Sequence, residues 1–347
     1  MKKLRLLALM DEVLVPPDDP PKDVDLTEAD WKTEFDVVTT LRNLGHEVQC
    51  LGVGSDLGIV RNAIAESQPH AVFNLLEDFH DVPIYDQNVV SYLELLGVPY
   101  TGCNSRGLML ARDKGISKKL LSYHRIPVPE FAVFRMGSAV RRPARLAFPL
   151  IVKSLTKEGS AGIAQTSLVH DDEKLAERVA LIHKRQRTDA IAERYIDGRE
   201  LYVGVLGNQR LMVLPIWELL FTKVPEEAPR IATERVKWDA AYRTRHGIKS
   251  NLAKGLPDAL VARIKTLCKR IYRVLELSGY ARIDLRLDSE GRVYVLEANP
   301  NPQLAYGEDF AESAEQAGVQ YDGLLQRIVN LALQRVPNGR PGTPVAT

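Results

Sequence analysis

The segment at residues 282–302, RIDLRLDSEGRVYVLEANPNP, constrains the fold more than any other part of the chain. Two runs of alternating apolar and polar residues flank the tetrapeptide DSEG, which has Asp first and Gly last, as type I turns prefer. We therefore predict an antiparallel hairpin with this tetrapeptide as its loop. Such a loop pairs Leu287 with Arg292. The same register places Asp284 opposite Val295.

Alternation along the two predicted strands separates an apolar face from a polar face. The apolar face comprises Ile283, Leu285, Leu287, Tyr294, Leu296 and Ala298, and the polar face comprises Arg282, Asp284, Glu297 and Asn299. Carboxylate and amide oxygens are the hard ligands that Mg²⁺ prefers, so we predict a metal site at Asp284, Glu297 and Asn299. The alternative is a solvent-exposed charged face, but the second strand is too apolar for an exposed strand.

Composition excludes several classes of partner. The chain has 347 residues, enough for two or three domains, and a formal net charge of +1. That charge does not indicate a nucleic-acid or membrane-surface partner, and no apolar run approaches the roughly 18 residues of a membrane span. The three cysteines (Cys50, Cys103 and Cys268) are far apart and show no metal-binding spacing. We therefore expect a cytoplasmic protein without nucleic-acid or membrane partners.

Residues 1–110 alternate between strand and helix patterns. Strands are predicted at residues 4–10, 47–53, 71–76 and 98–101, and helices at residues 30–44, 57–67 and 87–96. Strands that alternate with helices indicate βαβ units and a parallel sheet. We therefore predict an N-terminal α/β domain with a small Rossmann-like parallel sheet.

The remainder of the chain has a mixed α+β pattern. Helices are predicted at residues 112–123, 172–184, 257–277 and 319–334, and strands at residues 148–154, 190–205 (with a turn at 197–198) and 210–217. Residues 222–255 carry many charges and two Pro-containing turns, and are predicted to form a mobile loop region. We predict domains at residues 1–110, 111–190 and 191–335, followed by a disordered Pro/Gly tail at 336–347.

A glycine-rich loop follows the strand that carries Lys153. It contains Gly159, Ser160, Ala161 and Gly162 between two predicted strands, so backbone N–H groups there can approach an anion closely. A plain hairpin tip is the alternative, because no Walker-type G-K-[ST] follows. The loop alone therefore leaves phosphate binding open.

A series of short motifs resembles the ATP-grasp enzymes, and most closely the D-alanine–D-alanine ligases. The motifs are LELLGVPYTG (93–102), DK (113–114), IPVP (126–129), the strand and loop at 150–162, the segment 193–200, RID (282–284) and LEAN (296–299). They occur in the family's order and near its spacing, and cover residues 90–335. The resemblance implies a two-lobed ATP-grasp module after the N-terminal domain, with ATP bound between two antiparallel sheets.

The resemblance also implies which residues bind ATP. They are Lys114, Lys153, Ser160, Glu193, Arg194, Ile196, Glu200 and Lys237. The lysines and the serine would lie at the phosphates, the segment 193–196 at the adenine, and Glu200 at the ribose. Lys237 would reach the site from the mobile segment. Two Mg²⁺ ions, with Mn²⁺ as a substitute, would occupy the predicted metal site.

The implied reaction is the ADP-forming ligation of a carboxylate to an amine. ATP would phosphorylate the carboxylate of an amino acid or small peptide, and an amine would attack the resulting acyl phosphate. Arg282, beside the metal site, is the predicted donor to the oxyanion. One alternative is a nucleotide-binding regulator without turnover, and another is a biotin-carboxylase-like or phosphoribosyl-amine enzyme. A homodimer is a compatible assembly.

Three segments depart from the ligase pattern. Residues 10–13 replace the family's Gly-Gly-Ser-type start, residues 76–88 replace its His-Gly and Gly-Glu-Asp-Gly segment, and residues 300–303 replace its Thr-x-Pro-Gly. Residues 76–88 contain Asp81 and Asp86, which suit a larger or cationic amine better than alanine. We therefore expect substrates other than two D-alanines.

Overall fold

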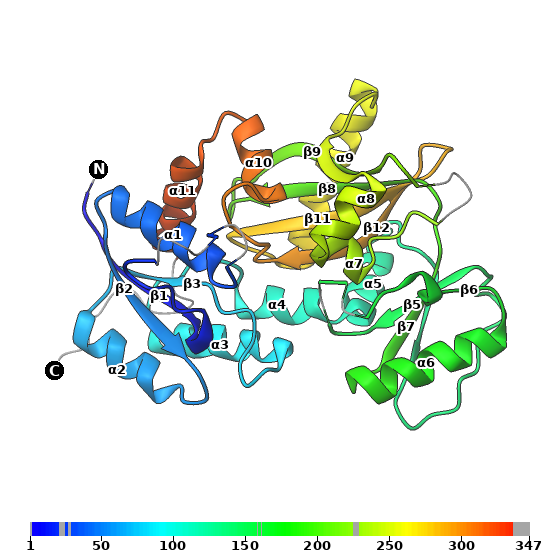
Figure 1. Ribbon diagram of the computed structural model, residues 1–347, viewed down its shortest axis with the longest axis horizontal. Helices are drawn as coiled ribbons and strands as arrows, with labels where there is room; N and C mark the ends of the chain where they lie inside the picture. Colours follow the sequence, from blue (N-terminus) through cyan, green and yellow to red (C-terminus); the bar gives the residue numbers. More distant parts are fainter. Residues whose placement is uncertain are drawn as a thin grey trace.

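Three separate sheets organise the molecule (Figure 1), and the computed structural model describes residues 2–20, 25–26, 29–157, 159–160, 162–224 and 229–335. Their strand orders are β2-β1-β3, β4-β7-β5-β6 and β10-β9-β8-β11-β12. The predicted class is confirmed, because a parallel N-terminal sheet precedes two antiparallel sheets. Ala161 and the predicted tail at 336–347 lie outside the described residues. Within those residues, no helix has the length and apolar character needed to cross a membrane.

The N-terminal sheet is buried on both faces. Its strands are β1 (Arg5–Asp11), β2 (Glu47–Val53) and β3 (Ala71–Asn74), and its helices are α1 (Lys32–Asn43), α2 (Gly58–Ser67) and α3 (Asp86–Leu96). Alternate β1 side chains pack in opposite directions: Leu6 and Met10 towards α1, and Leu7 and Leu9 towards α2 and α3. The predicted strand at 98–101 is reduced to a single bridge from Tyr100 to β3.

A four-stranded antiparallel sheet forms the small lobe. Its strands are β4 (Phe131–Phe134), β5 (Leu150–Ser154), β6 (Leu168–Val169) and β7 (Ala190–Arg194). Helix α6 (Asp172–Gln186) covers one face with an apolar stripe that includes Leu175 and Val179. The opposite face carries Lys153 and Glu193, and both side chains line a cleft.

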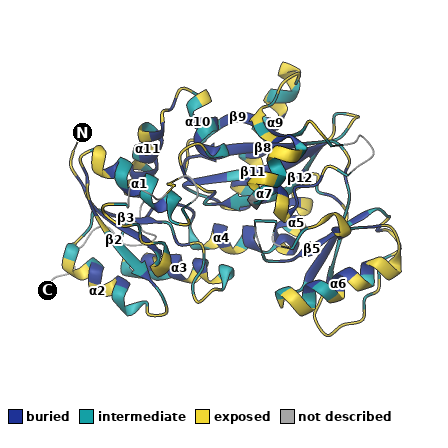
Figure 2. Cartoon of the chain, in the orientation of Figure 1, coloured by how far each residue is buried: buried dark blue, intermediate teal, exposed yellow. Residues whose placement is uncertain are grey.

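The five-stranded sheet forms the large lobe. Its strands are β8 (Arg199–Leu206), β9 (Met212–Phe221), β10 (Ile248–Leu252), β11 (Tyr280–Leu287) and β12 (Val293–Pro300). Its other elements are α9 (Asp258–Val274), α10 (Asp309–Gln316) and α11 (Tyr321–Leu333). Ile264 and Cys268 of α9 share a buried cluster with β8 and β11, whereas α11 packs against α1. β8 and β11, which are neighbours inside this sheet, are buried along almost their whole length (Figure 2).

Residues 222–255 are not the loop region that their charges predicted. Their described part contains α7 (Glu234–Trp238), α8 (Ala240–His246) and β10, which pairs with β9. Val236 and Ile248 are buried in one cluster with Trp217. The prediction failed because these isolated apolar anchors are separated by charged residues and show no periodicity.

Several short elements were also not predicted. The helix predicted at 112–123 is confirmed as α5 (Lys114–Tyr123), whereas α4 (Ser105–Arg112), which an extended Asp113 separates from α5, was not predicted. The Asp113 carboxylate caps α5 by accepting a hydrogen bond from the Ile116 N–H at 2.8 Å. β4 and α10 were missed because four and eight residues carry little periodic signal.

The predicted hairpin forms with a different register. Leu287 pairs with Val293 instead of Arg292. The Asp288 N–H donates to the Arg292 carbonyl at 3.0 Å, and the Asp288 carboxylate accepts from the Arg292 N–H at 2.8 Å. The loop therefore closes one residue later than the tetrapeptide predicted, and Val293 replaces Tyr294 on the apolar face.

A β-bulge then restores the polar face of the hairpin. The register shifts between Asp284 and Leu285. Leu285 pairs with Val295, whereas Asp284 pairs with Glu297 and not, as predicted, with Val295. The extra residue, Leu296, lines the cleft instead of packing in the core. The bulge thus places two carboxylates opposite each other on neighbouring strands.

Candidate active site

A cleft between the small and large sheets contains the predicted nucleotide residues. All eight line it: Lys114, Lys153, Ser160, Glu193, Arg194, Ile196, Glu200 and Lys237. Asp284 and Glu297 line the same cleft. Arg282 and Asn299 line a second cavity, which adjoins the cleft because Lys237 belongs to both. Residues from five separate stretches of sequence therefore meet at one place.

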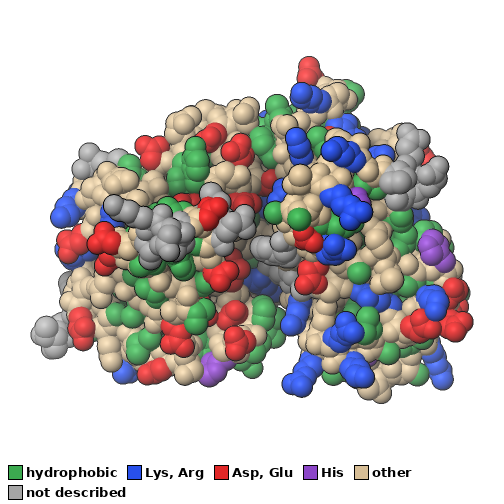
Figure 3. All heavy atoms as spheres, in the orientation of Figure 1, with side chains coloured by type: hydrophobic (Ala, Val, Ile, Leu, Met, Phe, Trp, Pro, Cys, Tyr) green, Lys and Arg blue, Asp and Glu red, His purple; other side chains and the backbone are tan. Residues whose placement is uncertain are grey.

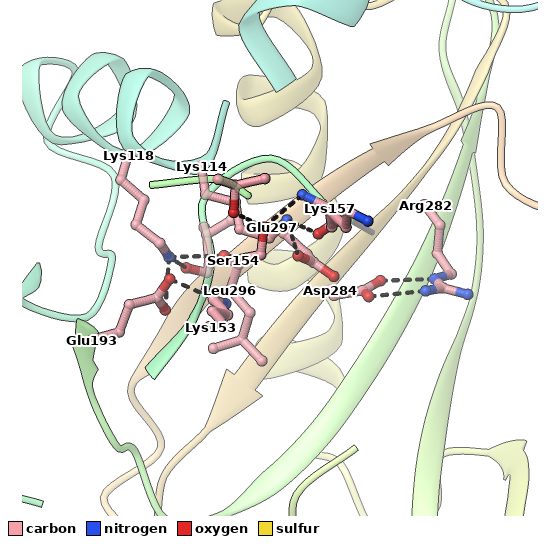
Figure 4. Close-up of polar contacts among 12 residues, drawn as sticks. Lys114, Lys118, Lys153, Ser154, Lys157, Glu193, Arg282, Asp284, Leu296 and Glu297 are labelled. Atoms are coloured by element: carbon pink, nitrogen blue, oxygen red, sulfur yellow. Dashed lines mark hydrogen bonds and ion pairs between the residues drawn. The ribbon is translucent and has the colours of Figure 1, made fainter. Parts of the chain in front are cut away.

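Two buried lysines hold the carboxylate of Glu193 (Figure 4). Lys153 Nζ on β5 lies 3.1 Å from Glu193 Oε1 on β7, and Lys118 Nζ on α5 lies 3.2 Å from Glu193 Oε2. Burial raises the pKa of Glu193, but the two lysines outweigh burial and lower it. Two cations against one carboxylate leave a net positive charge, which suits phosphate binding.

Lys118 was not predicted as a site residue. It is almost fully buried and also donates to the Leu296 carbonyl at 2.8 Å, so it joins the small lobe to the hairpin. Burial lowers the pKa of Lys118 to about 8, although Glu193 acts in the opposite direction. Its position among the polar residues of a helix gave no sequence signal of this burial.

The carboxylates of the hairpin have different partners. Glu297 Oε2 lies 3.6 Å from Lys114 Nζ, whereas Asp284 accepts two hydrogen bonds from Arg282, at 2.8 and 2.9 Å. Burial raises the pKa of Glu297, but Lys114 and Lys153 outweigh it and hold that pKa below its usual range. Burial prevails at Asp284 and raises its pKa despite Arg282. Glu297 therefore remains ionised and available to a cation.

The donor set of the hairpin fits a hard divalent cation. Asp284 and Glu297 face each other in the β11–β12 register, and Asn299 lies two residues further along β12. Asn299 Nδ2 is buried and has no hydrogen-bond partner among the described residues. Two carboxylates and one amide oxygen match the ligands that Mg²⁺ takes together with phosphate and water.

Glu200 is held by a buried ion pair. Its Oε2 lies 2.8 Å from Arg286 Nη2, and its Oε1 accepts a hydrogen bond from the Tyr202 hydroxyl at 3.0 Å. Glu200 is therefore not an ordinary surface carboxylate. Arg286 was missed, although strand alternation places it on the polar face with Arg282 and Asp284.

Hydrogen bonds join two segments that border the cleft, the glycine-rich loop and helix α7. The Gly162 N–H donates to Glu234 Oε2 at 2.7 Å, and the Glu234 N–H donates to the Ile163 carbonyl at 2.9 Å. These bonds join the glycine-rich loop to α7, which carries Lys237. Ser160 and Lys237 both line the cleft below this junction.

The three segments that depart from the ligase pattern surround the second cavity. Its lining includes Asp11 from the first segment, Glu77 and Asp81 from the second, and Gln303 from the third. Asp86 does not line it: its carboxylate is buried and accepts two hydrogen bonds from Arg112. The expectation that Asp86 receives an amine is therefore corrected, because that carboxylate already holds a buried guanidinium.

Comparison with known protein families agrees with this geometry. The family model described as "D-ala D-ala ligase C-terminus" matches residues 120–330, which include both antiparallel sheets and the whole hairpin. The chain belongs to the D-alanine–D-alanine ligase family. The match spans most of the cleft residues, from Lys153 to Glu297.

Similar proteins cover most of this ligase-family chain. It is 33% identical over 304 residues to the uncharacterised protein y4sG of Sinorhizobium fredii, which covers 86% of this chain and 87% of that protein. It is 31% identical over 303 residues to a D-alanine–D-alanine ligase of Desulforudis audaxviator, with coverage of 86% and 92%. The structure of a Bacillus anthracis D-alanine–D-alanine ligase complexed with ATP shares the fold, with a TM-score of 0.74, 22% identity, and coverage of 95% and 98%.

These relationships define the class of enzyme. The protein is an ATP-dependent ligase of the ATP-grasp carboxylate–amine class, and its family uses ATP with Mg²⁺. The alternative of a nucleotide-binding regulator without turnover is not favoured. The relatives that are D-alanine–D-alanine ligases act on small amino-acid substrates.

Proposed function

We propose that this ligase phosphorylates the carboxylate of an amino acid or small peptide and couples the acyl phosphate to an amine, with release of ADP and phosphate. The observation that supports it is the junction of two sites. A cleft that six basic and four acidic side chains of the described residues line adjoins a cavity, and Arg282 lies at the boundary beside Asp284. Phosphoryl transfer depends mainly on positioning and charge neutralisation, which this arrangement provides.

Different residues of the cleft bind different parts of ATP. Lys114 and Lys153 neutralise phosphate charge, Ser160 covers it, and Lys118 keeps Glu193 in place. The segment 193–196 lies against the adenine and Glu200 against the ribose. Two Mg²⁺ ions held by Asp284, Glu297 and Asn299, or Mn²⁺ in their place, would supply electrostatic stabilisation of the transferred phosphoryl group.

Arg282 would stabilise the oxyanion that forms when the amine attacks. Its guanidinium is oriented by the bidentate pair with Asp284 and by the Tyr202 ring, whose centroid lies 4.6 Å from Arg282 Cζ. Burial acts to lower the pKa of Arg282, but Asp284 outweighs it and raises that pKa, so the donor stays charged. A preoriented cation in a buried site stabilises a developing negative charge without reorganisation.

The proposed reaction predicts amine-dependent release of ADP. The test is to incubate the protein with ATP and Mg²⁺ and a panel of D- and L-amino acids and dipeptides, singly and in pairs. ADP formation that requires both a carboxylate and an amine supports the proposal. ADP formation that requires bicarbonate or a sugar phosphate would assign the protein to a different ATP-grasp reaction, and ATP binding without any turnover would contradict it.

The substrate cavity predicts weak activity with D-alanine alone. All three segments that depart from the ligase pattern line that cavity. We therefore expect its polar groups to fit two alanines poorly. Buried polar groups left unpaired cost roughly 1–3 kcal/mol each. D-alanine turnover on the order of 1 s⁻¹ or faster, and better than with any other pair, would show this prediction wrong.

Lys153→Met is predicted to weaken ATP binding. Lys153 is buried and charged, and its ion pair with Glu193 would be replaced only in part by Lys118. We expect a loss of roughly 1–3 kcal/mol, the scale of a charged hydrogen bond. Calorimetry with a non-hydrolysable ATP analogue measures it, with the exposed Lys174→Met on α6 as the control. Equal affinities for the two variants would remove Lys153 from the phosphate site.

Closure over ATP is predicted to protect residues 236–242 from hydrogen exchange. These residues lie in α7, in α8 and between the two helices, and hydrogen bonds of Glu234 join α7 to the glycine-rich loop. A non-hydrolysable ATP analogue with Mg²⁺ should slow exchange there and leave α6, on the outer face of the small lobe, unchanged. Unchanged protection of residues 236–242 would contradict a lid role for this segment.

We also propose a division of the chain into three domains. The predicted limit at residue 335 is kept, whereas the limit at 110 falls inside α4 and moves to the end of that helix at Arg112. β7 pairs with β4 and β5, so sheet membership supports a second limit after Arg194 instead of 190. A cytoplasmic location is supported by three free cysteines, two of them buried. A homodimer stays a proposal, which sedimentation of the purified protein tests.

A further inference from the structure

The second cavity has a strongly acidic wall. Eight carboxylates and four basic side chains of the described residues line it. Two of the basic side chains, Arg112 and Arg282, are already paired with Asp86 and Asp284, which do not line it. Figure 3 shows this face of the molecule hollowed between its two halves, with acidic side chains gathered on the N-terminal side.

Glu34 is the buried group of this wall. It lies in the first turn of α1, is 5% exposed, and lines the cavity. Its Oε2 is buried without a hydrogen-bond partner, and no ion pair joins Glu34 to a basic side chain in the described part of the chain. A buried carboxylate oxygen without a partner in the protein can accept a hydrogen bond from a ligand, because leaving it unpaired is energetically costly.

The groups that face Glu34 are acidic as well. Burial raises the pKa of Glu34 to about 7, and the nearby charges of Glu77 and Asp11 act in the same direction. Burial, together with Asp11 and Asp81, likewise raises the pKa of Asp78 on the same wall. A cationic ligand group next to Glu34 Oε2 would stabilise the ionised form of this carboxylate against burial and repulsion.

The geometry favours an organic cation over a metal ion. Among the described residues, no group of three or more His, Cys, Asp or Glu side chains is placed to hold a metal. An ammonium or guanidinium group needs only hydrogen-bond acceptors around it, which Glu34, Asp11 and Glu77 provide.

We propose that the cavity selects an amino-acid substrate with a basic side chain, and that Glu34, assisted by Asp11 and Glu77, binds the side-chain cation. This inference rests on the proposed ligase function. A neutral amino acid has no side-chain cation and leaves Glu34 Oε2 without a donor. A basic amino acid brings one further cation to the wall while its reacting groups lie towards Arg282 and Asn299.

The first test compares basic amino acids with neutral isosteres in the unmodified enzyme. Lysine is compared with norleucine and ornithine with norvaline, as both D- and L-isomers, by amine-dependent ADP release. We expect kcat/KM to be about 10- to 100-fold higher for the basic member of the preferred pair, as one charged hydrogen bond provides. A preference below about 3-fold, or one for the neutral member, overturns the proposal.

The second test places the selection on Glu34. Glu34→Gln should raise KM for the basic substrate about 10-fold or more and leave kcat/KM for its neutral isostere within about 3-fold. Glu66→Gln makes the same chemical change at an exposed position on α2 and should match the unmodified enzyme. An equal loss with basic and neutral substrates would show that Glu34 binds a group common to all amino acids, which overturns the assignment.

The outcomes separate this inference from the proposed function. If no amino acid supports ADP release, the ligase proposal fails. Calorimetry that compares the binding of lysine and norleucine then still tests whether the acidic wall binds a side-chain cation. Tighter binding of lysine supports a cation site, and equal binding overturns it. If Glu34→Gln does not fold, as judged by its thermal melt, the comparison of isosteres in the unmodified enzyme decides alone.

Discussion

Glu297→Gln is expected to abolish ligation while the protein still folds and binds ATP weakly. The substitution keeps the shape of the side chain but removes the ionised carboxylate that Lys114 and Lys153 stabilise. An amide in this position is a poorer ligand for Mg²⁺, and the phosphate charge of the transition state loses its counter-ion. We expect ADP formation to fall about 10³-fold or more, the factor that several kcal/mol of lost transition-state stabilisation produces.

The matched control for this prediction lies on the same hairpin. Glu290→Gln changes an exposed carboxylate in the turn, where its partner is the exposed Arg292. It should leave ADP formation within about 2-fold of the unmodified enzyme, since exposed pairs contribute little. Residual ATP affinity of Glu297→Gln is measured by calorimetry. Full turnover of this variant at ordinary Mg²⁺ would remove Glu297 from the metal site.

Arg282→Lys is expected to lower kcat about 10²- to 10³-fold, as the loss of an oxyanion donor does. Lysine keeps the charge but cannot reproduce the two hydrogen bonds that fix the guanidinium against Asp284. The KM for ATP should change little, because Arg282 lines the substrate cavity and not the nucleotide cleft. A loss confined to kcat therefore distinguishes a role in the reaction from a role in nucleotide binding.

The same change elsewhere on the hairpin provides the control for Arg282. Arg292→Lys alters an exposed guanidinium that pairs with Asp288 in the turn. It should leave kcat unchanged, and its thermal melt should resemble that of Arg282→Lys if both variants fold normally. A normal kcat for Arg282→Lys would contradict the assignment of the oxyanion donor.

The polar face of the hairpin was predictable because a strand has a period of two and the side chains of one face are close in sequence. Arg282, Asp284, Glu297 and Asn299 could therefore be assigned together from the pattern of residues alone. The register was not predictable, because it depends on how Asp288 closes the turn and on the bulge at Leu296. The predicted partners of Leu287 and Asp284 were both wrong, but Asp284 and Glu297 still lie side by side as the pattern predicted.

Long-range ion pairs were the main part of the site that the sequence could not reveal. Arg286 and Glu200 lie 86 residues apart, and Arg112 and Asp86 lie 26 apart. No local pattern marks such pairs, because each member alone resembles an ordinary charged surface residue. Glu34 was missed for the same reason: its burial depends on the packing of α1 beside the second cavity.

The central claim is that ATP phosphorylates a carboxylate before the amine attacks. The most direct measurement uses the pair of substrates that gives the fastest ADP release, with ¹⁸O in both oxygens of the carboxylate, and mass spectrometry of the phosphate and nucleotide products. The amine displaces the phosphate together with one carboxylate oxygen, so each amide bond formed should yield one ¹⁸O-labelled phosphate and one unlabelled ADP. Unlabelled phosphate, or ¹⁸O recovered in AMP, would contradict the account.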